Sequence, residues 1–222
     1  MDGVINGECI TEMRQMRSGS VDMFLSDIPY GEVSNTLKGK PTGFGGLRKI
    51  DRGDADQCDI ELCTMVDEAV RIVTGSFYVF CGTEQISTLV TQFKSHKLTT
   101  RVCAWEKSNP SPMNGSRLWL SGMEFCVFAR KPKAIFNKHC EKALWKFPVG
   151  RSKNHPTEKP VKLMEYLIES STNETDTVLD CTMGSGTTGV ACQNLNRRFV
   201  GIELNPLYYL MALERLTQNG QA

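Results

Sequence analysis

The stretch that most limits how this chain can fold is "TVLDCTMGSGTTGVA", residues 177–191. A short apolar run ends on Asp180, a glycine turn follows over 182–186, and residues 187–196 then have helical character. A strand that passes through a glycine turn into a helix starts a βα unit, and the next strand, "RRFVGIEL" (197–204), can pair with it in parallel. The unit therefore predicts an α/β fold built on a parallel sheet.

The rest of the chain alternates in the same way. Strands are predicted at 21–25, 76–82, 99–107, 123–131, 177–181 and 197–204, and helices at 59–73, 83–96, from Pro160 through Ile168, 187–196 and 206–218. With 222 residues, 40% of them hydrophobic, we expect one domain over 1–222, a doubly wound and mostly parallel sheet. The glycine-rich, polar segment 31–57 is predicted to be a mobile flap.

Composition excludes several classes of protein. No run of about 18 apolar residues exists, so no membrane span is expected. The N-terminus lacks the charged and apolar regions of a signal peptide. Nine cysteines without a CxxC pair favour reduced thiols in a cytoplasmic protein, and no metal site is expected.

Positive charge is concentrated between Arg130 and Lys153. This segment contains eight Lys and Arg residues and one acidic residue, so its net charge is +7, whereas the net charge of the whole chain is only +1. Aromatic residues lie among these charges. A solvated surface and a phosphate-binding surface both fit this pattern.

The glycine turn can bind a cofactor. Gly184, Gly186 and Gly189 would let a ligand approach the backbone at a helix N-terminus. No lysine follows them, which disfavours a P-loop, but "GSGTTG" does fit the dinucleotide pattern. Few strands follow the unit, which weighs against a dinucleotide fold. Glu203 is placed to bind ribose hydroxyls and Asp180 to meet an ammonium, and the two together describe S-adenosylmethionine.

Four motifs in order give the chain a family resemblance. "DIPY" (27–30), "HPTEKPVKLMEYLI" (155–168), "VLDCTMGSGTTGVA" (178–191) and "RRFVGIELNPLYYLMALERL" (197–216) resemble the β group of the DNA amino-methyltransferases. In that group the catalytic motif precedes the cofactor motif. The resemblance implies a class I S-adenosylmethionine-dependent methyltransferase fold with circularly permuted motifs and a small target-recognition insertion. Two places depart from the family: Ile28 replaces a proline, and Cys181-Thr182 replaces Pro-Phe.

The resemblance gives the tetrapeptide Asp27, Ile28, Pro29 and Tyr30 the catalytic role. Asp27 and the carbonyl of Ile28 would accept hydrogen bonds from the target amine, Pro29 would fix the backbone, and a flipped base would stack on Tyr30. Since the backbone supplies the second acceptor, we expect reduced but real activity with Ile28. Ile28→Pro is expected to raise or preserve the rate.

The remaining site residues follow from the same matching. Predicted cofactor ligands are Asp180, Gly184, Ser185, Gly186, Thr187, Glu203, Asn205, Thr157 and Lys159, with Lys159 neutralising the cofactor carboxylate. Predicted DNA-binding residues are Trp105, Lys107, Arg117, Arg130, Lys131, Lys133, Lys138, Lys142, Lys146 and Arg151, mostly within a candidate recognition insertion over 108–153. Trp105 fits the core equally well.

The predicted substrate is double-stranded DNA, methylated on the N6 of adenine. An Asp opening the tetrapeptide favours adenine, whereas relatives acting on the N4 of cytosine more often carry Ser. Three alternatives stay open: an N4-cytosine enzyme, methylation of RNA or protein glutamine, and a non-catalytic protein that binds nucleic acid. We further expect a bacterial or phage-infected host cytoplasm, a link to restriction-modification, and a homodimer.

Overall fold

The computed structural model describes residues 3–30, 60–112, 115–150 and 158–220. The predicted flap at 31–57 and two predicted site residues, Thr157 and Arg151, lie outside these ranges. Among the described residues, no helix is long and apolar enough to cross a membrane.

An eight-stranded sheet forms the centre of the molecule, in the order β1-β8-β7-β2-β3-β5-β4-β6. The strands are β1 (Gly3–Asn6), β2 (Val21–Asp27), β3 (Val73–Cys81), β4 (Thr99–Lys107), β5 (Met123–Arg130), β6 (Leu144–Phe147), β7 (Thr177–Asp180) and β8 (Arg198–Glu203). Only β5 runs against the others, pairing antiparallel with β3 and β4. The predicted doubly wound, mostly parallel α/β fold is confirmed.

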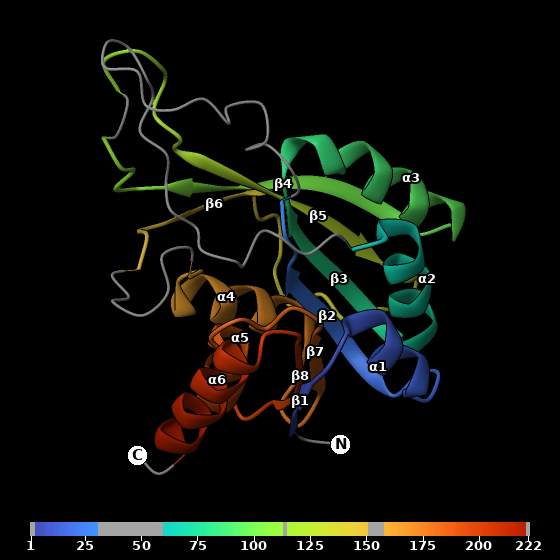
Figure 1. Cartoon of the computed structure of the whole chain (residues 1–222). Coiled ribbons are helices and arrows are strands. Elements are labelled where there is room, and N and C mark those ends of the chain that lie inside the picture. The colour runs from blue at the N-terminus through green and yellow to red at the C-terminus, as the bar shows by residue number, and fades with distance from the viewer. Residues whose placement is uncertain (1–2, 31–59, 113–114, 151–157, 221–222) are drawn as a thin grey trace.

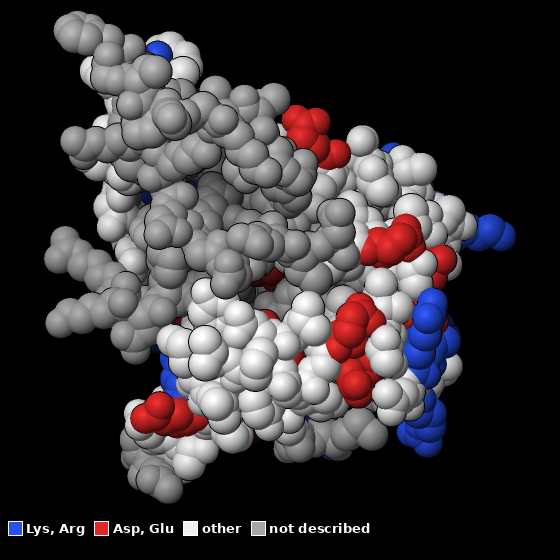
Figure 2. Space-filling model, viewed as in Figure 1, with Lys and Arg blue, Asp and Glu red and all other residues white. Residues whose placement is uncertain are grey.

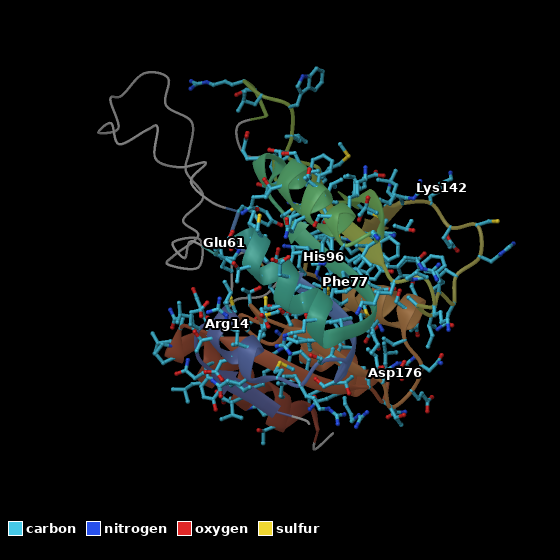
Figure 3. The ribbon with its side chains drawn as sticks, turned by 90° about the vertical axis from the view of Figure 1, so that its right-hand side faces the viewer. Arg14, Glu61, Phe77, His96, Lys142 and Asp176 are labelled. Carbon is cyan, nitrogen blue, oxygen red and sulfur yellow. The ribbon has the colours of Figure 1, made fainter. Side chains whose placement is uncertain are left out.

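Helices cover both faces of the sheet (Figure 1). Helices α1 (Cys9–Gln15), α2 (Leu62–Ile72) and α3 (Ile86–Ser95, after the 3-10 turn Thr83–Gln85) pack on one face. Helices α4 (Val161–Ser171), α5 (Thr187–Asn194) and α6 (Pro206–Asn219) pack on the other. Figure 3 shows α2 and α3 over their face, where Phe77 of β3 packs 5.3 Å from the Phe93 ring. Two apolar cores therefore sandwich the sheet.

Three elements were not predicted. The first two, β1 and α1, lie before residue 21, where β1 pairs with β8 at the edge of the sheet. The third, β6, pairs with β4 and lies in the basic segment. Each is only four to seven residues long, too short for a periodic pattern.

The sheet narrows the predicted recognition insertion at 108–153. Strand β5 lies between β3 and β4 in the middle of that range and contributes Cys126, Val127 and Ala129 to the cores. Residues 123–130 therefore belong to the central sheet. Segments 108–112, 115–122 and 131–150 remain outside it, apart from β6.

Strand direction decides which residues meet. Asp27, Asp180 and Glu203 end three neighbouring parallel strands. They therefore lie together along the edge of the sheet that the C-terminal ends of these strands form. Because β5 is antiparallel, its first residues, Met123 and Glu124, lie at this same edge. We refer to this row of strand ends as the catalytic edge, because it carries the predicted catalytic residue Asp27.

Candidate active site

Asp27 ends β2 at the catalytic edge, beside Lys159. The Lys159 ammonium lies 2.5 Å from Oδ2 of Asp27. The other oxygen, Oδ1, is buried and has no hydrogen-bond partner among the described residues. Burial raises the pKa of Asp27, the nearby Lys159 opposes this shift, and Glu124 adds to it. One oxygen of the Asp27 carboxylate is therefore bound to Lys159, and the other accepts no hydrogen bond from the described residues.

The backbone after Asp27 is held on both sides. The Ile28 N–H donates to the carbonyl of Phe80, and the Ile28 side chain is buried in the core. The amide of Gln85 donates to the Pro29 carbonyl at 2.8 Å, and the Thr182 hydroxyl donates to the Asp27 carbonyl at 3.1 Å. No described residue donates to the carbonyl of Ile28, which leaves that acceptor available beside Asp27.

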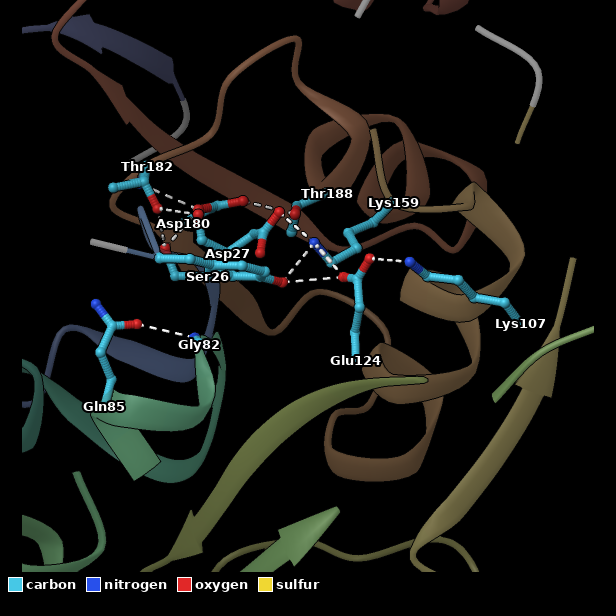
Figure 4. A network of polar contacts seen from close by, with 11 residues as sticks. Ser26, Asp27, Gly82, Gln85, Lys107, Glu124, Lys159, Asp180, Thr182 and Thr188 are labelled. Carbon is cyan, nitrogen blue, oxygen red and sulfur yellow. Dashed lines mark hydrogen bonds and ion pairs between the residues drawn. The ribbon is translucent and has the colours of Figure 1, made fainter. Parts of the chain in front are cut away.

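A network of alternating charges extends from Asp27 to the end of β4 (Figure 4). Lys159 contacts Glu124 at 2.9 Å, and Glu124 in turn pairs with Lys107 at 2.7 Å. The hydroxyl of Tyr30 donates to Glu124 at 2.9 Å and accepts from Lys159 at 3.1 Å. Two carboxylates and two ammonium groups thus balance one another in a largely buried place.

The charges set the protonation of this network. Burial alone would raise the pKa of Glu124, but Lys159 and Lys107 outweigh it and lower that pKa to about 2. Burial alone would lower the pKa of Lys159, but Asp27 and Glu124 outweigh it and raise that pKa. Burial and both carboxylates raise the pKa of Tyr30. At neutral pH Glu124 is ionised, Lys159 is charged and Tyr30 is neutral.

Asp180 ends β7 and is satisfied by the protein itself. Its Oδ1 accepts from the Ser26 hydroxyl at 2.6 Å and the Thr182 N–H at 3.1 Å, and its Oδ2 accepts from the Thr188 hydroxyl at 2.6 Å. Burial raises the pKa of Asp180 to about 6, against the effect of these donors. Asp180 therefore holds the turn through these bonds, and its predicted contact with a cofactor ammonium stays a prediction.

The glycine turn has the backbone that its sequence requires. Gly184 and Gly186 have φ values of 52° and 80°, in the left-handed region that side chains disfavour. A Cβ on Gly186 would lie 3.1 Å from the Cβ of Ala212, because α6 packs against the turn. Glycine is needed here for both conformation and space.

Glu203 ends β8 beside this turn. Its two oxygens accept one backbone hydrogen bond each, from Gly184 at 2.9 Å and Asn205 at 2.8 Å. Each oxygen keeps a further lone pair, which suits the two hydroxyls of a ribose. The carboxylates of Asp180 and Glu203 flank the turn, and negative charge there opposes a pyrophosphate and favours a cationic ligand.

Residues before and after the turn are held by α6 and by Glu158. The guanidinium of Arg215 lies 3.3 Å from the Ser185 and Thr187 hydroxyls and pairs with Glu158 at 2.6 Å. Ser185, Glu158 and Arg215 border a cavity of about 500 Å³ that also reaches Lys159. The predicted ligand Asn205 caps α6 through its side chain, which accepts from the Leu207 N–H at 2.9 Å.

Trp105 is not a DNA contact. It is 1% exposed, and its indole N–H donates to the Phe147 carbonyl at 2.9 Å. The side chain packs in the core, because alternate residues of β4 face α4. The prediction that it meets the target base was therefore wrong for a physical reason: no face of the ring is open.

Several predicted DNA-binding cations lie at the opposite edge of the sheet. Arg130 pairs in register with Ser76 near the start of β3, and the Lys131 ammonium donates to the Val70 carbonyl at 2.8 Å. The chain continues through Lys133 to Lys138, which stacks over Tyr166 of α4 at 4.8 Å. Because β5 leads the chain away from Asp27, we expect the DNA contacts nearer to Asp27 than these four cations.

Other predicted DNA contacts keep an exposed position. Lys146 pairs with Glu106 near the end of β6 and is 64% exposed, and Arg117 and Lys142 are also exposed. Lys107 is held by Glu124. Figure 2 shows one group of basic side chains on the described surface beside α1, and further basic side chains elsewhere on this face.

Sequence reasoning missed four polar residues that build the site. Ser26 and Thr188 hold Asp180, Glu124 holds Lys159, and Arg215 holds the turn. Thr188 and Ser26 neighbour motif residues, which was a usable signal. Arg215 lies within the motif at 197–216 and had the same signal, whereas Glu124 had none, since only the packing of β5 brings it in.

Comparisons with known proteins agree with this geometry. The family described as DNA methylase, of the N6 and N4 type, matches residues 21–214. The chain is 28% identical over 226 residues to the type II methyltransferase M2.MboI of Moraxella bovis, covering 90% of this chain and 82% of that protein. It is 27% identical to the type II methyltransferase M.HinfI of Haemophilus influenzae, covering 98% of this chain and 69% of that one.

Solved structures give the same result. The M1.HpyAVI–SAM complex superposes with a TM-score of 0.74 at 30% identity, covering 97% of this chain and all of that one. The cytosine-N4-specific PvuII DNA methyltransferase shares the fold with a TM-score of 0.70 at 14% identity, covering all of this chain and 92% of that one. The chain belongs to the DNA methylase family, the S-adenosylmethionine-dependent amino-methyltransferases of DNA.

Proposed function

We propose that this protein methylates the N6 of adenine in double-stranded DNA. The main support for this proposal is a pair of hydrogen-bond acceptors at the end of β2. They are Oδ1 of Asp27, which is buried without a partner among the described residues, and the carbonyl of Ile28. An exocyclic amine has two N–H groups, and these acceptors suit both. The Asp that opens the tetrapeptide favours adenine over cytosine.

The acceptors would act on the nucleophile. The lone pair of the amine is delocalised into the ring, and two hydrogen bonds draw the nitrogen toward a tetrahedral shape. S-adenosylmethionine, when bound, supplies a methyl group activated by a sulfonium. Asp27 and Ile28 hold the nitrogen in line with that methyl group, so alignment and fixed dipoles account for the rate gain. The methylated nitrogen then loses its proton.

The cofactor residues fit S-adenosylmethionine. Glu203 offers lone pairs to the ribose, and the turn at Gly184 and Gly186 lets the methionine end approach the backbone. The Thr182 hydroxyl bonds the Asp27 carbonyl, which keeps the turn next to the catalytic motif. We assign the cofactor to this place, with Ser185 and Thr187 beside it.

Segment 115–122 is the proposed DNA contact. Trp119 is fully exposed, Leu118 and Leu120 beside it are about half exposed, and Arg117 precedes them. The segment leads into β5 at the catalytic edge, so it projects from the side where a base would enter (Figure 1). An arginine for phosphate and a ring for stacking suit a duplex opened at one base.

Salt dependence tests this surface. Binding of an unmethylated duplex is measured between 50 and 200 mM salt for the wild type, Arg117→Gln and Lys133→Gln. We expect Arg117→Gln to reduce the slope of log K against log salt by about 1, and Lys133→Gln to leave it unchanged. An unchanged slope for Arg117→Gln would remove segment 115–122 from the interface.

Product analysis tests the reaction. The protein is incubated with methyl-labelled S-adenosylmethionine and unmethylated duplex DNA of mixed sequence, and the DNA is digested to nucleosides. We expect the label in N6-methyladenine. Label in N4-methylcytosine would establish the alternative within the same family. Labelled RNA or protein with unlabelled DNA, or no label at all, would overturn the proposal.

Two variants control that experiment. Asp27→Ala should lose at least about 10²-fold in rate, since a charge-aligned acceptor is removed. Asp67→Ala removes an exposed carboxylate on α2 that pairs with His96, and it should keep the wild-type rate. Sequencing of the methylated DNA then gives the recognition site.

We further propose a homodimer and a cytoplasmic location. Leu207, Leu210 and Leu213 of α6, together with Leu204, leave an apolar face 41–69% exposed, which a second copy would cover. Light scattering on Leu207→Glu/Leu210→Glu tests this: a dimer should become a monomer. A wild-type monomer at micromolar concentration would refute it.

A further inference from the structure

The Lys159 ammonium lies in a pocket of oxygens and is 5% exposed at its side chain. Its Nζ lies 2.5 Å from Oδ2 of Asp27, 2.9 Å from Oε2 of Glu124 and 3.1 Å from the hydroxyl of Tyr30. A lysine has three N–H donors. Three partners use all of them, so none remains for the carboxylate of a cofactor.

We propose that Lys159 is a positioning residue for Asp27, and not a ligand of the cofactor carboxylate; this inference rests on the function proposed above. By holding Oδ2, the ammonium fixes the rotation of the Asp27 carboxylate. Oδ1 then faces the place where the target amine must donate. Lys159 acts through Asp27 and touches neither the base nor the methyl group.

Glu124 holds Lys159 in this position. One of its oxygens contacts the Lys159 ammonium and the Tyr30 hydroxyl, and the other pairs with Lys107 at 2.7 Å. The rings of Phe80 and Tyr30 also lie near the ammonium, each with its centroid 5.3 Å from Nζ. A lone lysine would swing among rotamers, whereas this one is fixed by charge on two sides and by rings.

Removal of any one charged side chain from this network should destabilise the others. The four charges alternate and cancel, and removal of one leaves an uncompensated charge in a place shielded from water. The titratable groups that face Asp27 are Lys159, Glu124 and Tyr30, with Asp180, Cys81 and Cys126 farther away. Lys159 is the one cation among these described groups.

Kinetics and binding of Lys159→Met test the proposal. We expect kcat for methyl transfer to fall by about 10²-fold, because the acceptor is no longer aligned. The dissociation constant for S-adenosylmethionine, measured by calorimetry, should change less than about twofold. The acid limb of the kcat–pH profile should move up by about one pH unit, since a carboxylate loses its neighbouring positive charge.

Carbon-13 NMR of the carboxyl groups gives a readout that needs no activity. The Asp27 signal is assigned by comparison with Asp27→Asn, and its titration is followed in the wild type, Lys159→Met and Glu124→Gln. We expect the Asp27 pKa to rise in Lys159→Met. In Glu124→Gln the freed lysine should leave the Asp27 signal split or broadened, with a smaller loss of kcat.

Two controls separate positioning from a merely structural role. Lys159→Arg keeps the positive charge and should recover at least tenfold of the lost kcat. Lys162→Met removes an exposed lysine one residue into α4, which pairs with Glu165, and should leave kcat and the pH profile unchanged. Circular dichroism confirms that each variant is folded.

The outcomes are distinct. A tenfold weaker binding of S-adenosylmethionine by Lys159→Met, with an unmoved pH profile, would make Lys159 a cofactor ligand and overturn the proposal. A lower melting temperature with unchanged kcat would also overturn it. If the wild type methylates no DNA while the Asp27 titration still shifts in Lys159→Met, the proposed function fails but the positioning role of Lys159 stands.

Discussion

Ser26 donates a hydrogen bond of 2.6 Å to Asp180, although 154 positions separate them in the chain. Ser26 lies next to Asp27, the proposed catalytic residue, and Asp180 opens the glycine turn. The bond exists because β2 and β7 are parallel neighbours that end at the same edge. The parts of the chain that would hold the base and the cofactor are thereby joined through one buried hydroxyl.

Ser26→Ala should destabilise the fold by about 1–3 kcal/mol at pH 8, because it removes a buried donor to an ionised carboxylate. The pKa of Asp180 is raised to about 6, so wild-type stability falls as pH rises from about 4 to 6, where the unfolded state releases its proton first. The loss in Ser26→Ala should therefore be smaller at pH 5. Urea unfolding at both pH values measures this. Ser76→Ala is the matched control, since its buried hydroxyl has no partner among the described residues and its removal should be neutral or stabilising.

Glu124 should make the protein sensitive to acid. Its folded pKa of about 2 lies below the value of 4.5 for a free glutamate, so its contribution is present above pH 4.5 and is lost as pH falls toward 2. The contribution amounts to at most about 3 kcal/mol. The difference in unfolding free energy between the wild type and Glu124→Gln should shrink between pH 7 and pH 3. An equal difference at both would contradict the pairing with Lys159 and Lys107.

Gly186→Ala should damage the glycine turn. The left-handed backbone costs about 1–2 kcal/mol with a side chain, and the new methyl group would press on Ala212. We expect lower stability in urea and weaker binding of S-adenosylmethionine. Gly122→Ala is the control, because its Cβ would meet only the Leu120 carbonyl, at 3.8 Å, and it does not line the cavity beside Ser185. Equal affinities in both variants would show that the turn does not contact the cofactor.

Two tryptophans should respond in opposite ways. Trp105→Phe should lower the unfolding free energy by about 1–3 kcal/mol, through lost packing and the lost bond to Phe147, with DNA affinity of the folded protein unchanged. Trp119→Ala should leave stability within about 0.5 kcal/mol, because the side chain is fully exposed. It should weaken binding to duplex DNA by about 1–3 kcal/mol if the ring stacks on a base. Fluorescence titration with DNA measures both.

Ile28→Pro should destabilise this protein, which revises the expectation of an equal or higher rate. The Ile28 N–H donates to the Phe80 carbonyl, and proline lacks that donor. The loss of a buried bond and of packed side-chain atoms should cost about 1–3 kcal/mol. Melting temperature reports this directly, and the rate per folded molecule reports the catalytic effect separately. An unchanged melting temperature would show that the loop adjusts around proline.

The sequence predicted the parts of the site that lie at strand ends. Asp27, Asp180 and Glu203 each end an apolar run, and parallel strands bring such residues to one edge. Their location follows from strand direction alone. The glycine turn was predictable for a similar reason, since only glycine adopts its φ values without strain.

The partners of those residues were not predictable. Lys159 was expected beside the cofactor, because nothing in the order of residues shows that Glu124 would approach it. That approach depends on β5 running against the sheet, and strand order is a tertiary property. The same reversal moves Arg130 and Lys131 away from the end of β2.

The reversal of β5 also determines how segment 108–122 is attached. It leaves the sheet at the end of β4 and returns at the start of β5, and a backbone bond of 2.8 Å from Lys107 to Gly122 closes its base. The intervening residues can be exchanged, lengthened or shortened without opening that closure. The DNA-contacting segment could therefore change, in evolution or by design, while the central sheet and the residues at its strand ends stay the same.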